Sequence, residues 1–253
     1  MTMTSGHKTI QEFNGHSGSK VYLKEWPDGG HYVEKIGNTE RNLERMSTLL
    51  AAGYPVPKIY HYEKDYMMME YIHGLDMKNY LVYNTTVSLL NFLYDTFDCF
   101  AVNSVSKDYT ETYHKKLDWL TDDFPFTKDE LIDRLPKILP QSIYHGDLTL
   151  ENILYTDPGF HMIDPVTIEY DSYIFDIAKL RQDVECKWFL RYSDVRLDTK
   201  LEFIRDSLKK EYPQAFDNSL LILMLLRVVK HCEKGDFNYQ FLMKEIRRLW
   251  TCK

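Results

Sequence analysis

Alternating apolar and polar side chains predict short strands in the first part of the chain. Residues 9–13 and 20–24 flank a stretch rich in glycine and serine, a pattern typical of two strands joined as a hairpin. Three more segments with strand-like patterning follow at residues 32–36, 58–63 and 66–71. The chain therefore begins with several strands that are close in sequence.

One amphipathic helix is predicted between these strands, at residues 39–52. Asn38 or Thr39 can cap its start, and Gly53 marks its end. The Pro-Val-Pro segment at residues 55–57 prevents the helix from continuing. The apolar stripe of this helix consists of Leu43, Met46, Leu49 and Leu50.

From residue 76 onward the apolar residues recur mainly at helical spacing. This pattern indicates a second region that is mostly helical and that contains the C-terminus. The helices are predicted at residues 89–100, 115–120, 128–139, 177–192, 199–212, 218–232 and 239–249.

Composition and charge narrow the classes of function. The chain has 253 residues and a formal net charge of −7, which argues against nucleic acid or an anionic membrane as the main partner. An acidic protein is also compatible with a cationic substrate, although only weakly. Four widely spaced cysteines and an N-terminus without a signal-like apolar stretch predict a cytoplasmic protein with reduced thiols. The longest apolar run, residues 220–226, is too short to span a membrane.

The most informative stretch is residues 141–165, QSIYHGDLTLENILYTDPGFHMIDP. A polar loop and two predicted strands, 153–155 and 160–163, bring two carboxylates and one amide toward one place. They belong to Asp147, Asn152 and Asp164. Phosphoryl transfer from a nucleotide needs such a set, because one carboxylate orients the attacking hydroxyl and the other oxygens bind Mg²⁺. The Asp-x-x-x-x-Asn spacing is that of the kinase catalytic loop. The alternative is that these side chains only cap turns.

The motifs HGDLTLENIL and HMIDP resemble the aminoglycoside phosphotransferase and choline kinase family. The resemblance implies an α+β, bilobal, protein-kinase-like fold. A small antiparallel-sheet lobe would comprise residues 1–74, and a larger, mainly helical lobe would comprise residues 75–253. It also implies ATP and Mg²⁺ as cofactors and a small-molecule hydroxyl as the acceptor. Asp147 would orient or deprotonate that hydroxyl, while Asn152 and Asp164 would bind the metal.

The same resemblance assigns the Gly/Ser-rich stretch to a loop that covers the nucleotide phosphates. A tight turn is the alternative reading, and the stretch is not a Walker A motif because Lys20 is followed by Val21. The candidate residues of this loop are Gly15, Ser17, Gly18 and Ser19. Lys35, on the next strand, would contact the α- and β-phosphates.

A glutamate on the helix should pair with Lys35 and hold it on the phosphates. The family pattern favours Glu44, whereas the helical wheel slightly favours Glu40, and either could instead be a solvated charge. After the last N-terminal strand, Glu70 and Tyr71 lie in a segment that resembles the hinge facing the adenine ring.

Asp176, in the sequence FDIA, resembles the residue that braces the catalytic loop in this family, although it could also cap a helix. It follows Asp164 by only twelve residues, which leaves no room for the activation segment of a protein kinase. Thr149 also stands where Ser/Thr protein kinases usually carry a lysine. A polypeptide substrate is therefore disfavoured.

The identity of the acceptor and the oligomeric state are not fixed by the sequence. The C-terminal helices would form the acceptor pocket, with Asp171, Asp183 and Glu185 as acidic candidates, although each alone is better explained as a solvated charge. Trp188, Phe189 and Tyr192 are aromatic candidates for stacking on the acceptor, although core packing explains them better. Two other functions stay open, namely a protein kinase or another transferase on this fold and a non-catalytic nucleotide-binding module.

Overall fold

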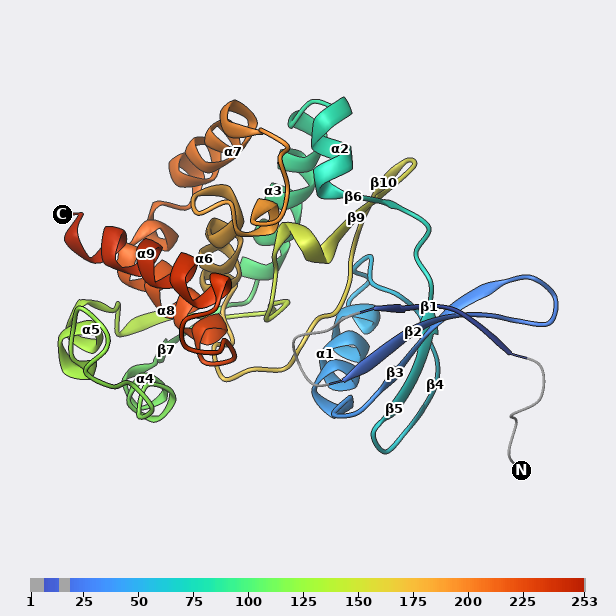
Figure 1. Cartoon of the computed structure of the whole chain (residues 1–253), viewed down its shortest axis with the longest axis horizontal. Coiled ribbons are helices and arrows are strands. Elements are labelled where there is room, and N and C mark those ends of the chain that lie inside the picture. The colour runs from blue at the N-terminus through green and yellow to red at the C-terminus, as the bar shows by residue number, and fades with distance from the viewer. Residues whose placement is uncertain (1–6, 14–18, 253) are drawn as a thin grey trace. The chain divides into compact units, whose positions relative to one another are not determined.

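The predicted N-terminal strands pair into one antiparallel sheet in the computed structural model, which describes residues 7–13 and 19–252. The five strands are arranged in the order β1-β2-β3-β5-β4 (Figure 1). Their bounds are β1 Lys8–Phe13, β2 Lys20–Glu25, β3 His31–Ile36, β4 Ile59–Glu63 and β5 Tyr66–Glu70. The hairpin expected from the alternating pattern is confirmed, because β1 and β2 pair antiparallel.

Helix α1 (Glu40–Ala51) follows β3, as its apolar stripe predicted. Its buried residues include Met46 and Leu49, neither of which is exposed to solvent. Met67 and Met69 on β5 are buried as well. Apolar burial therefore explains why these helix and strand residues are hydrophobic.

The contacts within the chain divide it into two units. Unit 1 comprises Met1–Asp76 and Asn152–Thr167, and unit 2 comprises Met77–Glu151 and Ile168–Lys253. The expected boundary after residue 74 is close to the first of these divisions. The hairpin after the catalytic loop, which we expected in the helical lobe, belongs by its contacts to unit 1.

This hairpin is part of a second, three-stranded sheet in unit 1. It pairs β9 (Ile153–Thr156) with β10 (Gly159–Met162), and β9 also pairs with β6 (Leu75–Asp76). The Met162 N–H donates a hydrogen bond to the carbonyl of Pro55, 2.8 Å away. The hairpin is thereby attached to the segment that follows α1.

Unit 2 is mainly helical and is built around α6 (Tyr173–Val184), all of whose residues are buried. α6 contacts α3, α7 and α8. The remaining helices are α2 Met77–Tyr83, α3 Val87–Ala101, α4 Thr110–Lys116, α5 Lys128–Arg134, α7 Asp198–Glu211, α8 Asn218–Val229 and α9 Phe237–Thr251. Short 3₁₀ helices occur at η1 Leu150–Asn152, η2 Trp188–Leu190 and η3 Pro213–Phe216.

Three helix predictions were wrong in their extent. The helix expected at residues 115–120 is α4, which ends at Lys116, and the helix expected at residues 177–192 ends at Val184. The helix expected over residues 128–139 ends with Arg134, and Ile138–Gln141 form strand β8, paired antiparallel with β7 (Val105–Asp108). Pro136 accounts for the difference, because it disfavours helical backbone at Leu135, which is extended. Thr127 caps the start of α5 in a capping box, with Glu130 as its partner.

Candidate active site

Unit 1 brings together three residues predicted for nucleotide and metal binding. Asn152 and Asp164 flank the β9–β10 hairpin, and the Ile163 N–H donates to the Asn152 carbonyl, 2.9 Å away. Lys35 extends from β3, and its ammonium nitrogen lies 2.5 Å from Asp164 Oδ1. The ammonium group of Lys35 and two side chains that offer oxygen ligands, Asn152 and Asp164, therefore lie in one unit.

The partner of Lys35 differs from the one we expected. Both glutamates considered for this role, Glu40 and Glu44, are exposed on α1, while the Lys35 side chain is only 4% exposed. Among the described residues, Lys35 forms its ion pair with Asp164. The expected Lys35–Glu44 pair is therefore replaced by a direct pair with the predicted metal ligand. The reason is that Glu44 lies on the solvent side of α1, away from the face that carries Met46 and Leu49.

The α1 residue that reaches this site is Asn42. Its side-chain amide donates one hydrogen bond to Asp164 Oδ1 (3.0 Å) and another to the Pro165 carbonyl (2.7 Å). Asn42 is buried, and it precedes Met46 and Leu49 by four and seven residues, so it lies on the buried face of the helix. α1 thus contributes an amide rather than a carboxylate to Asp164.

Asp164 has an uncommon backbone conformation, with φ of 55°. Non-glycine residues rarely adopt this left-handed region, although aspartate tolerates it better than most. Its carboxylate is about half exposed, at 49%, while its two partners are buried. Tertiary contacts therefore fix a carboxylate that is accessible to a ligand.

The predicted phosphate-covering loop falls mostly outside the described residues. Gly15, Ser17 and Gly18 are not described, whereas Ser19 is described and buried. A Cβ built on Gly37 would lie 3.1 Å from the Cα of Ser19, and Gly37 itself has φ of +122°. Glycine is therefore needed where the chain leaves β3 beside the end of this loop.

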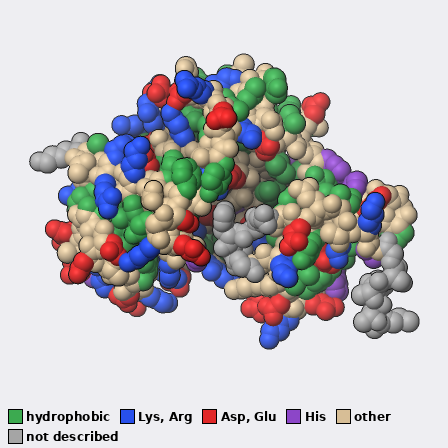
Figure 2. Space-filling model, viewed as in Figure 1, with side chains coloured by type: hydrophobic (Ala, Val, Ile, Leu, Met, Phe, Trp, Pro, Cys, Tyr) green, Lys and Arg blue, Asp and Glu red, His purple; other side chains and the backbone are tan. Residues whose placement is uncertain are grey.

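The predicted hinge residues lie at the end of β5. The Glu70 carboxylate accepts a hydrogen bond from the Lys58 N–H at 3.1 Å. The Tyr71 ring packs edge-on against His73, with ring centroids 4.5 Å apart, and also contacts His31. Histidine side chains gather on the surface of unit 1 in Figure 2. Glu70 and Tyr71 stay predictions as adenine-facing residues.

The catalytic loop in unit 2 is held by Asp176 of α6, as expected. Its carboxylate accepts hydrogen bonds from the backbone N–H groups of His145 (2.5 Å) and Gly146 (2.8 Å). Gly146 has φ of +93°, a conformation that few other residues adopt. Burial raises the pKa of the Asp176 carboxyl to about 7. Ser172 rather than Asp176 caps α6, so the bracing role is the one that applies.

Asp147 lies between two cations. Lys179 Nζ is 3.2 Å and Arg227 Nη2 is 3.6 Å from Asp147 Oδ1. Arg227 also donates to the Gly146 carbonyl at 2.9 Å. Burial disfavours the charged carboxylate, but these two cations outweigh it, so the pKa of Asp147 lies below its ordinary value. Asp147 is therefore ionised at neutral pH.

The other end of the loop is held by a second carboxylate of α6. Asp183 is fully buried and accepts hydrogen bonds from the N–H groups of Leu150 (2.6 Å) and Phe189 (3.1 Å). Burial raises the pKa of its carboxyl to about 7. Our expectation of a solvated charge at this position was wrong. Asp171 and Glu185 are likewise paired within unit 2, with Lys107 and Arg181 respectively.

Comparison with protein families identifies the chain. A model of the "Phosphotransferase enzyme family" matches residues 9–208, which include all the residues that the sequence predicted for catalysis, metal and nucleotide. The chain belongs to the phosphotransferase enzyme family. A search of curated proteins found no match.

Solved structures show that this phosphotransferase shares its fold with small-molecule kinases. Macrolide 2′-phosphotransferase type I is 13% identical, with 98% of this chain and 94% of that chain covered and a TM-score of 0.55. A choline/ethanolamine kinase family protein from Mesorhizobium loti is 15% identical, with coverage of 98% and 87% and a TM-score of 0.54. Amicoumacin kinase hAmiN, solved with AMP-PNP, Ca²⁺ and Ami, is 13% identical, with coverage of 95% and 87% and a TM-score of 0.54. The expected α+β, protein-kinase-like fold is confirmed.

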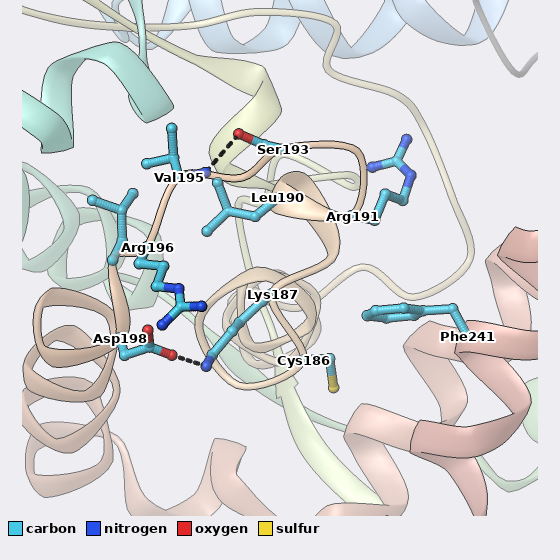
Figure 3. A pocket seen from close by; sticks show the side chains of 10 residues that line it. Cys186, Lys187, Leu190, Arg191, Ser193, Val195, Arg196, Asp198 and Phe241 are labelled. Carbon is cyan, nitrogen blue, oxygen red and sulfur yellow. Dashed lines mark hydrogen bonds and ion pairs between the residues drawn. The ribbon is translucent and has the colours of Figure 1, made fainter.

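Unit 2 of this phosphotransferase also contains a pocket of about 510 Å³ between η2, α7 and α9 (Figure 3). Its lining includes Lys187, Arg196, Asp198 and Phe241, and Lys187 forms an ion pair with Asp198. None of the residues predicted for catalysis, metal or nucleotide lines it.

In the part of the chain that the structure describes, no helix is long and apolar enough to cross a membrane.

Sequence reasoning missed three residues that contact the predicted site residues of this phosphotransferase, namely Asn42, Lys179 and Arg227. Two of them carried a usable signal. Asn42 shares the helical face of buried apolar residues, and Lys179 lies between the apolar residues Ala178 and Leu180, one turn after Asp176. A polar residue on a buried helical face indicates a polar partner inside the protein. Arg227 directly follows the apolar run at residues 220–226, but nothing in the sequence indicated that its partner would be Asp147, 80 residues away.

Proposed function

We propose that this phosphotransferase transfers the γ-phosphate of Mg·ATP to a hydroxyl group of a small molecule. The observation that carries the proposal is the pair of Lys35 and Asp164, 2.5 Å apart in unit 1, with Asn152 on the same hairpin. A lysine, a carboxylate and an amide oxygen are the groups that a kinase uses to hold nucleotide phosphates and their metal.

The donor set suits Mg²⁺. Asn152 and Asp164 offer oxygen ligands, which this hard cation prefers, and the half-exposed Asp164 carboxylate is accessible. When bound, the metal would neutralise charge on the phosphates. Lys35 would contact the α- and β-phosphates, and the loop of Gly15, Ser17, Gly18 and Ser19 would cover them. Glu70 and Tyr71 would face the adenine ring.

Asp147 would act on the acceptor. Its ionised carboxylate would accept a hydrogen bond from the acceptor hydroxyl and take its proton. The acceptor oxygen would then form the bond to the γ-phosphorus, and the bond between that phosphorus and the ADP oxygen would break. Asp176 and Asp183 support this role, because they fix both ends of the loop that carries Asp147.

A small molecule is a better acceptor than a polypeptide. Twelve residues separate Asp164 from Asp176, so the chain lacks the segment on which protein kinases bind peptide substrates. The amicoumacin kinase and the macrolide phosphotransferase share this fold and are named for small-molecule acceptors.

Transfer of radiolabel from [γ-³²P]ATP into a library of aminoglycosides, amino alcohols and sugars tests the proposal. A labelled small molecule that requires a divalent cation is the expected result. Label found only in protein would favour a protein kinase. Tight Mg·ATP binding with no labelled product from any hydroxyl compound, and no ADP formed, would favour a non-catalytic nucleotide-binding module.

A further inference from the structure

The catalytic loop of this protein carries no lysine or arginine. Residues 145–152 read HGDLTLEN, and Thr149 occupies the position two residues after Asp147. Thr149 is buried. Any cation that assists Asp147 must therefore come from another element of the fold.

Helix α6 supplies that cation on the same face as its two bracing carboxylates. Asp176, Lys179 and Asp183 are spaced i, i+3 and i+7, which places them along one side of the helix. Asp176 accepts from the start of the loop and Asp183 from its end. Lys179, between them, lies 3.2 Å from the loop's functional carboxylate, Asp147.

Burial of the Lys179 ammonium group in this position is energetically unfavourable. Its side chain is only 5% exposed, and burial lowers the pKa of its ammonium, while Asp147 opposes that effect. A buried ammonium group needs compensation by an anion and by hydrogen bonds. Asp147 provides the anion, and the Gln182 side-chain oxygen accepts a hydrogen bond at 3.2 Å. Both compensating groups lie within unit 2.

We propose that Lys179 is a positioning residue for phosphoryl transfer, which supplies from α6 the positive charge that the catalytic loop lacks. It holds Asp147 in its ionised form and fixes the direction of the carboxylate that receives the acceptor hydroxyl. An oxygen that gives its proton to Asp147 must come within about 3 Å of that carboxylate. The Lys179 ammonium therefore acts close to the reacting oxygen. This inference rests on the proposed function.

The test compares Lys179→Met with Lys179→Arg, using hydrolysis of Mg·ATP with water as acceptor and transfer to any acceptor found in the library. Lys200→Met is the matched control. Lys200 is also a partly buried lysine of unit 2, but its ammonium donates to the carbonyls of Leu81 and Asn84. Thermal unfolding and Mg·ATP affinity are measured for each variant to verify folding.

We expect Lys179→Met to lower kcat by about 100-fold while Mg·ATP affinity stays within about threefold. The acid limb of its pH–rate profile should move to higher pH by about one pH unit or more. The limb moves to higher pH because the pKa of Asp147 rises when this carboxylate loses one of its two cations. The other groups around that carboxylate are Arg227, His145 and Asp176. Lys179→Arg should keep the wild-type profile, and Lys200→Met should keep both rate and profile.

A second readout does not depend on activity. The Asp147 carboxyl carbon can be titrated by ¹³C NMR in the full chain, with Asp147→Asn providing the assignment. A higher pKa of Asp147 in Lys179→Met than in wild type supports the inference. Lys179→Gln, which is also neutral, serves if Lys179→Met fails to fold.

Equal rates and equal Asp147 titration in wild type and the neutral variant would overturn the role of Lys179. An equal loss of rate in Lys200→Met would do the same. If the wild-type protein transfers no phosphate at all, the proposed function fails instead, and the NMR titration still decides the electrostatic role of Lys179.

Discussion

The ammonium of Lys35 lies 2.5 Å from Oδ1 of Asp164, although 129 residues separate the two in the chain. This ion pair joins the strand predicted to hold the nucleotide phosphates to the carboxylate predicted to hold their metal. The Asn42 amide donates to the same oxygen. The lysine and the carboxylate predicted to bind the nucleotide and its metal therefore contact each other within unit 1, and the partner of Lys35 is not a glutamate of α1.

This relationship predicts different effects for two substitutions. Lys35→Met removes the cation that would contact the phosphates and leaves Asp164 without its ion pair. We expect Mg·ATP to bind about 10- to 100-fold more weakly, the range for loss of a hydrogen bond to charged groups. Isothermal titration calorimetry measures this affinity.

Glu44→Gln is the matched comparison, because Glu44 is exposed on α1 and does not pair with Lys35 in the structure. Its affinity for Mg·ATP should stay within about threefold of wild type. An affinity loss as large as that of Lys35→Met would return Glu44 to the role expected from the family pattern.

Asn42 should contribute to stability as well as to the site. Asn42→Leu removes the donors to Asp164 Oδ1 and to the Pro165 carbonyl while retaining a side chain of similar size. The free energy of unfolding should fall by about 1–3 kcal/mol, the usual cost of leaving a buried acceptor, here the Pro165 carbonyl, unpaired. Urea unfolding measures the change.

The control is Asn38→Leu, at an exposed asparagine that precedes α1. Its stability should stay within about 0.5 kcal/mol of wild type. Equal stability of the Asn42 and Asn38 variants would show that the Asn42 contacts are not made in solution.

The buried carboxyls of Asp176 and Asp183 predict how stability changes with pH. Burial raises both pKa values from an ordinary 3.8 to about 7, so the folded protein holds these protons where the unfolded chain has lost them. Between about pH 4 and 7, each group should therefore lower stability as pH rises, by up to about 1.4 kcal/mol per pH unit. Above pH 7 this contribution should level off.

Asp183→Asn removes one of the two titrating groups. Because asparagine changes the hydrogen bonds at every pH, the slopes of stability against pH are compared rather than absolute stabilities. The slope of the variant between pH 4.5 and 7 should be less negative than that of wild type. Identical slopes would mean that Asp183 titrates near its ordinary pKa.

Much of the architecture could be predicted because local patterns and the fold agree. The Gly/Ser-flanked strands formed a hairpin, and the stripe of Met46 and Leu49 formed a buried helical face. The motif at residues 141–165 was sufficient to identify the family that the comparison then established. These features depend on nearest neighbours in sequence, where periodicity and turn chemistry are informative.

The errors have physical causes that act over longer distances. Residues 138 and 139 were included in a predicted helix, but Pro136 and pairing with β7 made residues 138–141 a strand. The charge of Asp183 was read as solvated, because sequence alone does not show that two backbone N–H groups would compensate its burial. Partners of a buried polar group often lie far away in the chain, as Asn42 and Asp164 do.

The role of Asp147 is the central claim, and the Asp147→Asn variant tests it most directly. Asparagine keeps the shape of the side chain and removes its charge, so Mg·ATP affinity should stay close to wild type. The variant should fold with reduced stability, because the buried Lys179 ammonium loses its anion. The measurement is the rate of ³²P transfer from [γ-³²P]ATP to the acceptor at saturating Mg·ATP. We predict a loss of at least about 100-fold in kcat. A variant that folds, binds Mg·ATP and transfers phosphate at the wild-type rate would contradict the account.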